Sequence, residues 1–193
     1  KILTRESAER WVYHNSGHML FSGSDKGALK EKTQLTVADI LEMIKGVSKA
    51  TGPDFPIGVR ISADEFVPGG VTLKESPEIA RMLEAAGVAF ISVSEGTHES
   101  ADRCMGLMSD EEGWREYLWA AIKKAVDKVP ILGGGDLKHP DFCEKVLQRG
   151  SADFIGLGRP LLADPEWTNK AREGRTEDIR CCISCLECMP HGS

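Results

Sequence analysis

The sequence predicts an α/β protein of the (β/α)8 TIM-barrel family, to which this chain would contribute about four C-terminal βα units with parallel strands. Three observations support the prediction. Short strands alternate with amphipathic helices from residue 36 onward, the strands have one aliphatic and one mixed face, and glycine-rich loops follow the last two strands. In β/α barrels these two loops commonly form a phosphate site.

The first unit is a helix at residues 36–52 followed by a strand at 56–62. Thr36 is a suitable N-cap, apolar residues recur at helical spacing, and Gly52 ends the helix. The later units repeat this order. Further helices are expected at 76–87, 109–126, 139–150 and 164–174, and further strands at 88–96, 129–135 and 152–158.

Two of these helices carry start signals in their first residues. Ser76 is expected to cap the helix that Pro77 begins. Ser109 and Glu112 have the spacing of a capping box, in which the two side chains bind backbone N–H groups of the same helix. The capping box therefore marks the start of the helix expected at 109–126.

The strand faces favour a barrel over an open sheet. In residues 57–62, three aliphatic residues alternate with Gly58, Arg60 and Ser62. An open sheet covered by helices on both sides is more often aliphatic on both faces, whereas the interior of a barrel accepts a mixture. A complete barrel takes ~250 residues, so this chain is expected to be half of one, as part of an oligomer or together with the missing half.

The chain divides into three segments. Residues 1–35 have no clear pattern, 36–174 form the half-barrel, and 175–193 begin a cysteine-rich segment. The whole is 41% hydrophobic and 28% charged, which suits one sizeable core. A net charge of −6 argues against a nucleic-acid or anionic membrane partner. Without a membrane span or a signal peptide, we expect a cytoplasmic protein with reduced thiols and a small-molecule substrate.

Two glycine-rich loops are the first candidates for a binding site. They read "GGGD" at 133–136 and "GLGRP" at 156–160. Glycines let backbone N–H groups approach phosphate oxygens, and an arginine such as Arg159 can clamp a phosphate with two donors. The order of the two loops, each after a strand, predicts a phosphate site.

Longer blocks of the sequence resemble a known family. The blocks are "PDFPIGVRIS", "LEAAGVAFISVSEG", "VPILGGGDLKHPDFCEKVLQRGSADFIGLGRPLLADPEW" and "REGRTEDIRCCISCLEC". They are similar to consecutive segments of the old yellow enzyme superfamily, and more closely to its iron–sulfur flavoprotein branch. That branch includes 2-enoate reductases, 2,4-dienoyl-CoA reductases and trimethylamine dehydrogenase, and the resemblance covers roughly residues 37 to 189.

The resemblance implies that the half-barrel binds FMN. The FMN phosphate is expected on Gly134, Gly135, Asp136, Gly158 and Arg159. Asp136 departs from the family, in which this position is more often Gly, Asn or Arg. A carboxylate beside a phosphate would have to point away from it, or pair with Arg159 or with a nearby lysine, Lys138.

Two further residues receive roles from the same resemblance. Arg60 matches an arginine at the flavin pyrimidine edge, where a fixed positive charge stabilises the reduced flavin. The alternative is that Arg60 pairs with a carboxylate inside the barrel. His18, in "VYHNSGHML", is the candidate for holding the substrate carbonyl oxygen, although its spacing differs from the family motif and a surface histidine is the alternative.

The cysteine-rich segment predicts a metal centre. Cys182, Cys185 and Cys188 have C-x2-C-x2-C spacing, and thiolates select zinc or iron–sulfur clusters. The resemblance favours a 4Fe–4S cluster with a fourth cysteine beyond Ser193, and with Cys181 as a bystander. Zinc held by three cysteines and His191, or free thiols, are the alternatives.

The predicted function is that of a flavin-dependent oxidoreductase. Electrons would pass through the cluster and FMN to the conjugated C=C bond of an enoate or enoyl-CoA, and NAD(P)H and FAD could bind to regions outside this chain. The alternatives are an amine dehydrogenase with a reversed electron flow, a non-redox phosphate-binding lyase or isomerase, and a non-catalytic half-barrel subunit.

Overall fold

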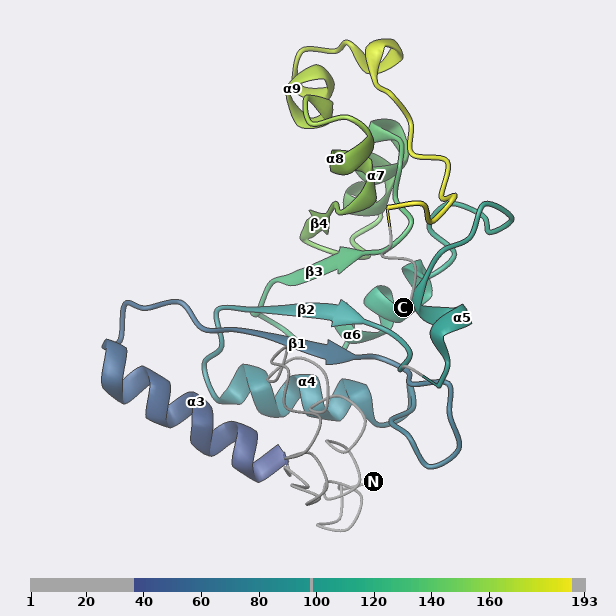
Figure 1. Cartoon of the computed structure of the whole chain (residues 1–193). Coiled ribbons are helices and arrows are strands. Elements are labelled where there is room, and N and C mark those ends of the chain that lie inside the picture. The colour runs from purple at the N-terminus through teal and green to yellow at the C-terminus, as the bar shows by residue number, and fades with distance from the viewer. Residues whose placement is uncertain (1–36, 98, 189–193) are drawn as a thin grey trace, which may run out of the picture.

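The computed structural model describes residues 37–97 and 99–188, and its centre is a four-stranded parallel sheet. The strands are β1 (Gly58–Ser62), β2 (Phe90–Ser94), β3 (Ile131–Gly134) and β4 (Phe154–Gly156). They lie side by side in chain order, each hydrogen-bonded to the one before it (Figure 1). Because the strand order does not reverse, the sheet is part of a barrel wall, unlike a doubly wound sheet.

Helices connect the strands. The longer ones are α3 (Val37–Thr51), α4 (Ser76–Ala85), α6 (Glu116–Lys123) and α7 (Pro140–Gln148). The shorter ones are α5 (Ala101–Cys104), α8 (Arg159–Ala163) and α9 (Trp167–Arg172), with a 3-10 turn η2 (Thr176–Asp178). None of the helices in the described ranges is long and apolar enough to span a membrane.

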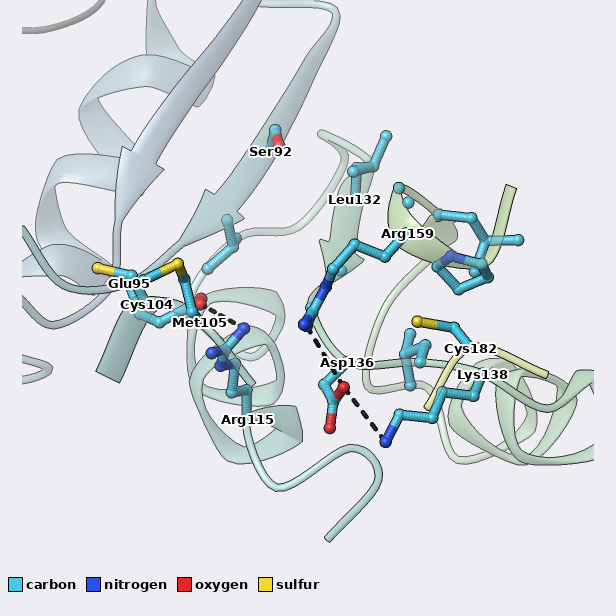
Figure 2. A pocket seen from close by; sticks show the side chains of 18 of the residues that line it. Ser92, Glu95, Cys104, Met105, Arg115, Leu132, Asp136, Lys138, Arg159 and Cys182 are labelled. Carbon is cyan, nitrogen blue, oxygen red and sulfur yellow. Dashed lines mark hydrogen bonds and ion pairs between the residues drawn. The ribbon is translucent and has the colours of Figure 1, made fainter. Parts of the chain in front are cut away.

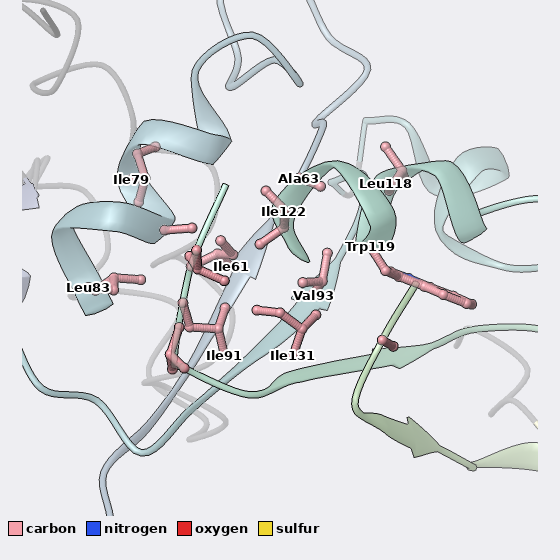
Figure 3. Close-up of a cluster of buried hydrophobic side chains, with 14 of the residues drawn as sticks. Ile61, Ala63, Ile79, Leu83, Ile91, Val93, Leu118, Trp119, Ile122 and Ile131 are labelled. Carbon is pink, nitrogen blue, oxygen red and sulfur yellow. The ribbon is translucent and has the colours of Figure 1, made fainter. Parts of the chain in front are cut away.

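The hydrophobic core lies between the sheet and the helices. Helix α4 contacts β1, α6 contacts β2 and β3, and α7 contacts β4. Ile91, Val93 and Ile131 are buried on the helix-covered face, together with Leu83 of α4 and Trp119 of α6 (Figure 3). The predicted aliphatic face of the strands is therefore the outer face of the barrel wall, as expected.

The opposite face of the sheet carries the predicted mixture. Arg60 is in register with Ser92 of the next strand, and both side chains lie on this face. Phe90 and Phe154 are also here, with 37% and 56% of their surfaces exposed. This inner face is apolar in part and open to solvent among the described residues, as expected for half of a barrel.

The helix predicted at 109–126 is shorter than expected. It begins at Glu116, because Gly113 has a left-handed φ of 73° and the capping box does not form. The Glu112 carboxylate instead accepts hydrogen bonds from the backbone N–H groups of Lys138 and His139. A contact between residues distant in the sequence therefore replaces a local one.

Two other boundaries differ from the prediction. Ser76 does not cap α4, since its hydroxyl donates to the carbonyl of Ala63 at 2.7 Å. The last predicted helix begins at Trp167, not Asp164, and an additional short helix, α8, precedes it. Thr36, the predicted cap of α3, lies outside the described residues.

Replacing Ile91 with alanine tests the core. Ile91 is fully buried in β2, so Ile91→Ala is expected to lower the free energy of unfolding by about 2–5 kcal/mol in urea denaturation. Met43→Ala, on the exposed side of α3, is the control and is expected to change it by less than about 0.5 kcal/mol. Equal effects of the two substitutions would contradict the described core.

Candidate functional site

A cavity of about 410 Å³ lies at the carboxyl ends of the four strands (Figure 2). Each strand or the loop after it contributes to the wall. The wall includes Arg60, Ser92, Glu95, Arg115, Leu132, Gly134, Gly135, Asp136, Lys138, Gly156, Gly158, Arg159, Cys182 and Leu186. All six residues predicted to bind flavin therefore line one cavity, together with one of the three predicted metal ligands.

Arg60 reaches the cavity from the inner face of β1. Its neighbours in the strand, Val59 and Ile61, face the helices, so the face predicted for Arg60 is confirmed. Among the residues that the structure describes, Arg60 makes no ion pair with a carboxylate. A guanidinium in this position remains available to an anionic ligand.

The two glycine loops meet where β3 and β4 end. A Cβ atom on Gly134 would lie 2.9 Å from the carbonyl oxygen of Gly156, so the two strand ends could not approach as closely with side chains there. Gly135 follows with a φ of 120°, which favours glycine. Gly158 leads directly into α8, whose first residue is Arg159.

Asp136 is buried between the loops, and its side chain is 1% exposed. Its Oδ1 atom lies 3.4 Å from both Arg159 Nη2 and Lys138 Nζ, and it accepts a hydrogen bond of 2.7 Å from the Ser184 hydroxyl. Asp136 is therefore paired with Arg159 and Lys138, as expected for a carboxylate beside a phosphate site. Asp136 has a left-handed φ of 54°, a conformation that asparagine and aspartate tolerate better than most residues.

Arg159 is held in place by two acceptors. Its Nη1 atom donates to the carbonyl oxygen of Gly106 at 2.8 Å, and its Nη2 atom faces Asp136. Gly106 follows α5, so the guanidinium joins the last glycine loop to the segment between β2 and α6. The side chain is 19% exposed and lines the cavity.

Glu95 and Arg115 are site residues that the sequence analysis missed. They form an ion pair of 2.8 Å in the cavity wall, with side chains 6% and 2% exposed. Burial raises the pKa of Glu95 to about 7, although the positive charges of Arg115 and Arg60 act against the rise. The position of Glu95, directly after β2 at the carboxyl end, was the signal that could have identified it.

The cysteine segment returns to the same cavity. Ser184, between Cys182 and Cys185, is buried, and its hydrogen bond to Asp136 holds the loop against the glycine sites. Cys182 lines the cavity, whereas Cys185 and Cys188 are exposed. Ser184 and Leu186 both have left-handed φ angles, of 55° and 64°.

The thiols are not gathered around one point. Within residues 37–97 and 99–188, no three His, Cys, Asp or Glu side chains are grouped closely enough to hold a metal ion. The sulfur of Cys181 lies instead 3.4 Å from Nε2 of His139, on the outside of the segment. The donor set suits a soft metal, and its role stays a prediction. His18, His191 and Ser193 lie outside the described residues.

The raised pKa of Glu95 predicts a pH dependence of stability. A carboxyl group that binds its proton more tightly in the folded state stabilises the fold below its ordinary pKa, and this stabilisation is lost as the pH rises through 7. Between pH 5 and 8, wild type should therefore lose stability relative to Glu95→Gln, by up to about 1.4 kcal/mol per pH unit. Urea denaturation of both proteins across this range would contradict the assignment if their pH profiles were parallel.

Comparisons with known proteins agree with the geometry. Residues 37–178 match the family described as NADH:flavin oxidoreductase / NADH oxidase. An NADH oxidase of Thermoanaerobacter brockii is 50% identical over 145 residues, and a cinnamate reductase of Clostridium sporogenes is 32% identical over 163 residues. These matches cover 75% and 77% of this chain, but only 22% and 24% of the two relatives.

A solved structure is also similar to the chain. The structure of a 2-naphthoyl-CoA reductase in complex with 2-naphthoyl-CoA has a TM-score of 0.73 and 34% identity, over 78% of this chain and 23% of that one. The chain thus spans less than a quarter of the length of each of these three relatives. Its half-barrel sheet, its glycine loops and the family match lead to one conclusion: this chain belongs to the NADH:flavin oxidoreductase / NADH oxidase family.

Proposed function

We propose that this chain is the phosphate-binding half of an FMN-dependent reductase that acts on the conjugated C=C bonds of enoates or enoyl-CoA thioesters. The observation that carries the proposal is the single cavity that joins Arg60, the two glycine loops, Arg159 and Cys182. Similarity to a cinnamate reductase and a 2-naphthoyl-CoA reductase supports this substrate class. A non-redox lyase or isomerase is disfavoured by the family match.

The residues of the cavity fit FMN. The glycines of the two loops line the cavity without side chains, so their backbone N–H groups could approach a phosphate, and Arg159 and Lys138 would supply positive charge for it. Asp136 would keep both cations in position while its own negative charge is offset by them. Arg60, across the cavity, would stabilise the negative charge that the flavin ring gathers on reduction.

Bound reduced flavin would supply a hydride to the β-carbon of the conjugated bond. The chain's part in this step is electrostatic and geometric. Arg159 and the loops would hold the phosphate end, and Arg60 would hold the ring end. His18 remains the candidate for polarising the substrate carbonyl group, which would make the β-carbon more electrophilic.

The cysteine segment would carry electrons to this site. We propose that Cys182, Cys185 and Cys188 bind a 4Fe–4S cluster, with the fourth ligand beyond Ser193. Cys182 already lines the cavity, so a cluster there would lie next to the flavin. Thiolates of this kind persist in a reducing environment, which suggests the cytoplasm as the location.

The inner face of the sheet would be covered by the other half of the barrel. Phe90 and Phe154 are large apolar residues that remain exposed on this face. Covering them would bury apolar surface and pair the edges of β1 and β4, to which no further strand is hydrogen-bonded in the part of the chain that the structure describes. NAD(P)H and FAD, where the protein uses them, would bind outside this chain.

Removing Arg159 tests the phosphate site. Arg159→Ala is expected to weaken FMN binding by about 10- to 100-fold, because a charge-assisted contact with the phosphate is lost. Arg149→Ala is the matched control, since Arg149 is also ion-paired, with Glu116, but lies outside the cavity. Fluorescence titration with FMN would contradict the site if the two variants bound FMN equally well.

Removing Cys185 tests the cluster and the reaction together. The intact protein is expected to bind about four irons per chain and to reduce cinnamate with NADH. Cys185→Ala should lose the iron and this NADH-driven reduction, whereas Cys181→Ala should retain both. Turnover of a tertiary amine without cinnamate reduction would contradict the substrate class, and zinc without iron would contradict the cluster.

A further inference from the structure

The Glu95–Arg115 pair contains two buried polar atoms without partners. Oε1 of Glu95 binds Nη1 of Arg115, and Nη2 of Arg115 donates to the carbonyl oxygen of Arg103. Oε2 of Glu95 and Nε of Arg115 have no hydrogen-bond partner among the described residues. Such atoms are rare in folded proteins, because a buried carboxylate oxygen loses its water without compensation.

The unpartnered oxygen belongs to a side chain that lines the cavity. Figure 2 shows Glu95 and Arg115 on one side of the cavity and Asp136, Lys138 and Arg159 on the other. Arg115 is fixed there by packing, since a Cβ atom on Gly135 would lie only 2.5 Å from its Nη1. The ion pair with Arg115 therefore holds the Glu95 carboxylate in a defined place in the cavity wall.

Glu95 lies between the two positive groups proposed to hold the ends of the flavin. It follows β2, whereas Arg60 is on β1 and the phosphate loops follow β3 and β4. Along the strand ends, the Glu95–Arg115 pair with its unpartnered carboxylate oxygen thus lies between the cation Arg60 and the cations Lys138 and Arg159, which surround Asp136. A ligand that fits this order has an anion at each end and hydrogen-bond donors between them.

FMN has this order of groups. Its phosphate is anionic, its reduced ring is negative along the pyrimidine edge, and the ribityl chain between them carries three hydroxyl groups. An ionised carboxylate accepts hydrogen bonds and repels anions, so it suits the hydroxyls and neither end. A hydroxyl donor would also give the buried oxygen of Glu95 the partner it lacks.

We propose that Glu95 binds the ribityl hydroxyl groups of the flavin, with Arg115 as the residue that positions its carboxylate. The inference rests on the proposed flavin function and deepens it. It assigns the middle of the cofactor to a residue pair that neither the glycine loops nor the cysteine segment includes. The pair would recognise flavins that carry a polyhydroxy chain, whether or not the chain ends in a phosphate.

Three flavins distinguish binding of the ribityl chain from binding of the phosphate and of the ring. FMN has the chain and the phosphate, riboflavin has the chain alone, and lumiflavin has a methyl group in place of both. The protein is stripped of flavin and titrated with each by fluorescence quenching. Glu95→Gln is expected to weaken the binding of FMN and of riboflavin by the same factor, about tenfold, and to leave the binding of lumiflavin unchanged.

Two further variants keep the test independent of folding. Glu95→Gln leaves the charge of Arg115 buried without its counter-charge, so Glu95→Leu combined with Arg115→Leu is made as well, because it removes both charges together. This double variant should show the same selective loss. Glu116→Gln, which breaks an ion pair outside the cavity, should bind all three flavins as wild type does.

The outcomes are distinct. Riboflavin affinity equal to wild type in both Glu95 variants would overturn the inference. A loss of lumiflavin binding as large as that of riboflavin would also overturn it, because Glu95 would then act on the ring or on folding. A wild-type protein that binds none of the three flavins would refute the proposed function itself.

Discussion

The parallel pairing of four short strands is the constraint on which the site depends. Because the strands all run in one direction and follow chain order, the residues after each strand meet at one edge. Arg60, Glu95, the loop at Asp136 and Arg159 come from four different βα units, and they meet in one cavity for this reason. The helices bury only the opposite face, which leaves the inner face for polar groups and for the ligand.

Asp136 controls the electrostatics of this edge. A carboxylate at a phosphate site is unfavourable on its own, but two cations and a hydroxyl surround its Oδ1 atom. The same atom joins the glycine loop to Ser184 in the cysteine segment, 48 residues further along the chain. The proposed flavin site and the proposed cluster segment therefore share a buried carboxylate. A substitution of Asp136 would alter the contacts of both.

The sequence predicted the features that depend on local pattern. Strand faces follow a period of two, so the positions of Arg60 and Ile91 could be assigned before the structure was known. The features it missed depend on contacts between distant residues. Glu112 binds the amides of Lys138 and His139 and so shortens α6, while Glu95 pairs with Arg115 across a loop. The place of Glu95 directly after β2 was a signal for the site, but no local spacing predicts which distant groups these carboxylates bind. Helices as short as α5 and α8 give little periodicity to detect.

A crystal structure of the flavin-loaded protein would test the central claim most directly, since that claim places the flavin phosphate between the two glycine loops. The account predicts phosphate oxygens within hydrogen-bonding distance of backbone N–H groups at Gly135 and Gly158 and of the Arg159 guanidinium, with Asp136 still paired to Lys138. A phosphate bound elsewhere in the barrel would contradict it, as would an Arg159 guanidinium that contacts only Gly106 and Asp136 and not the phosphate.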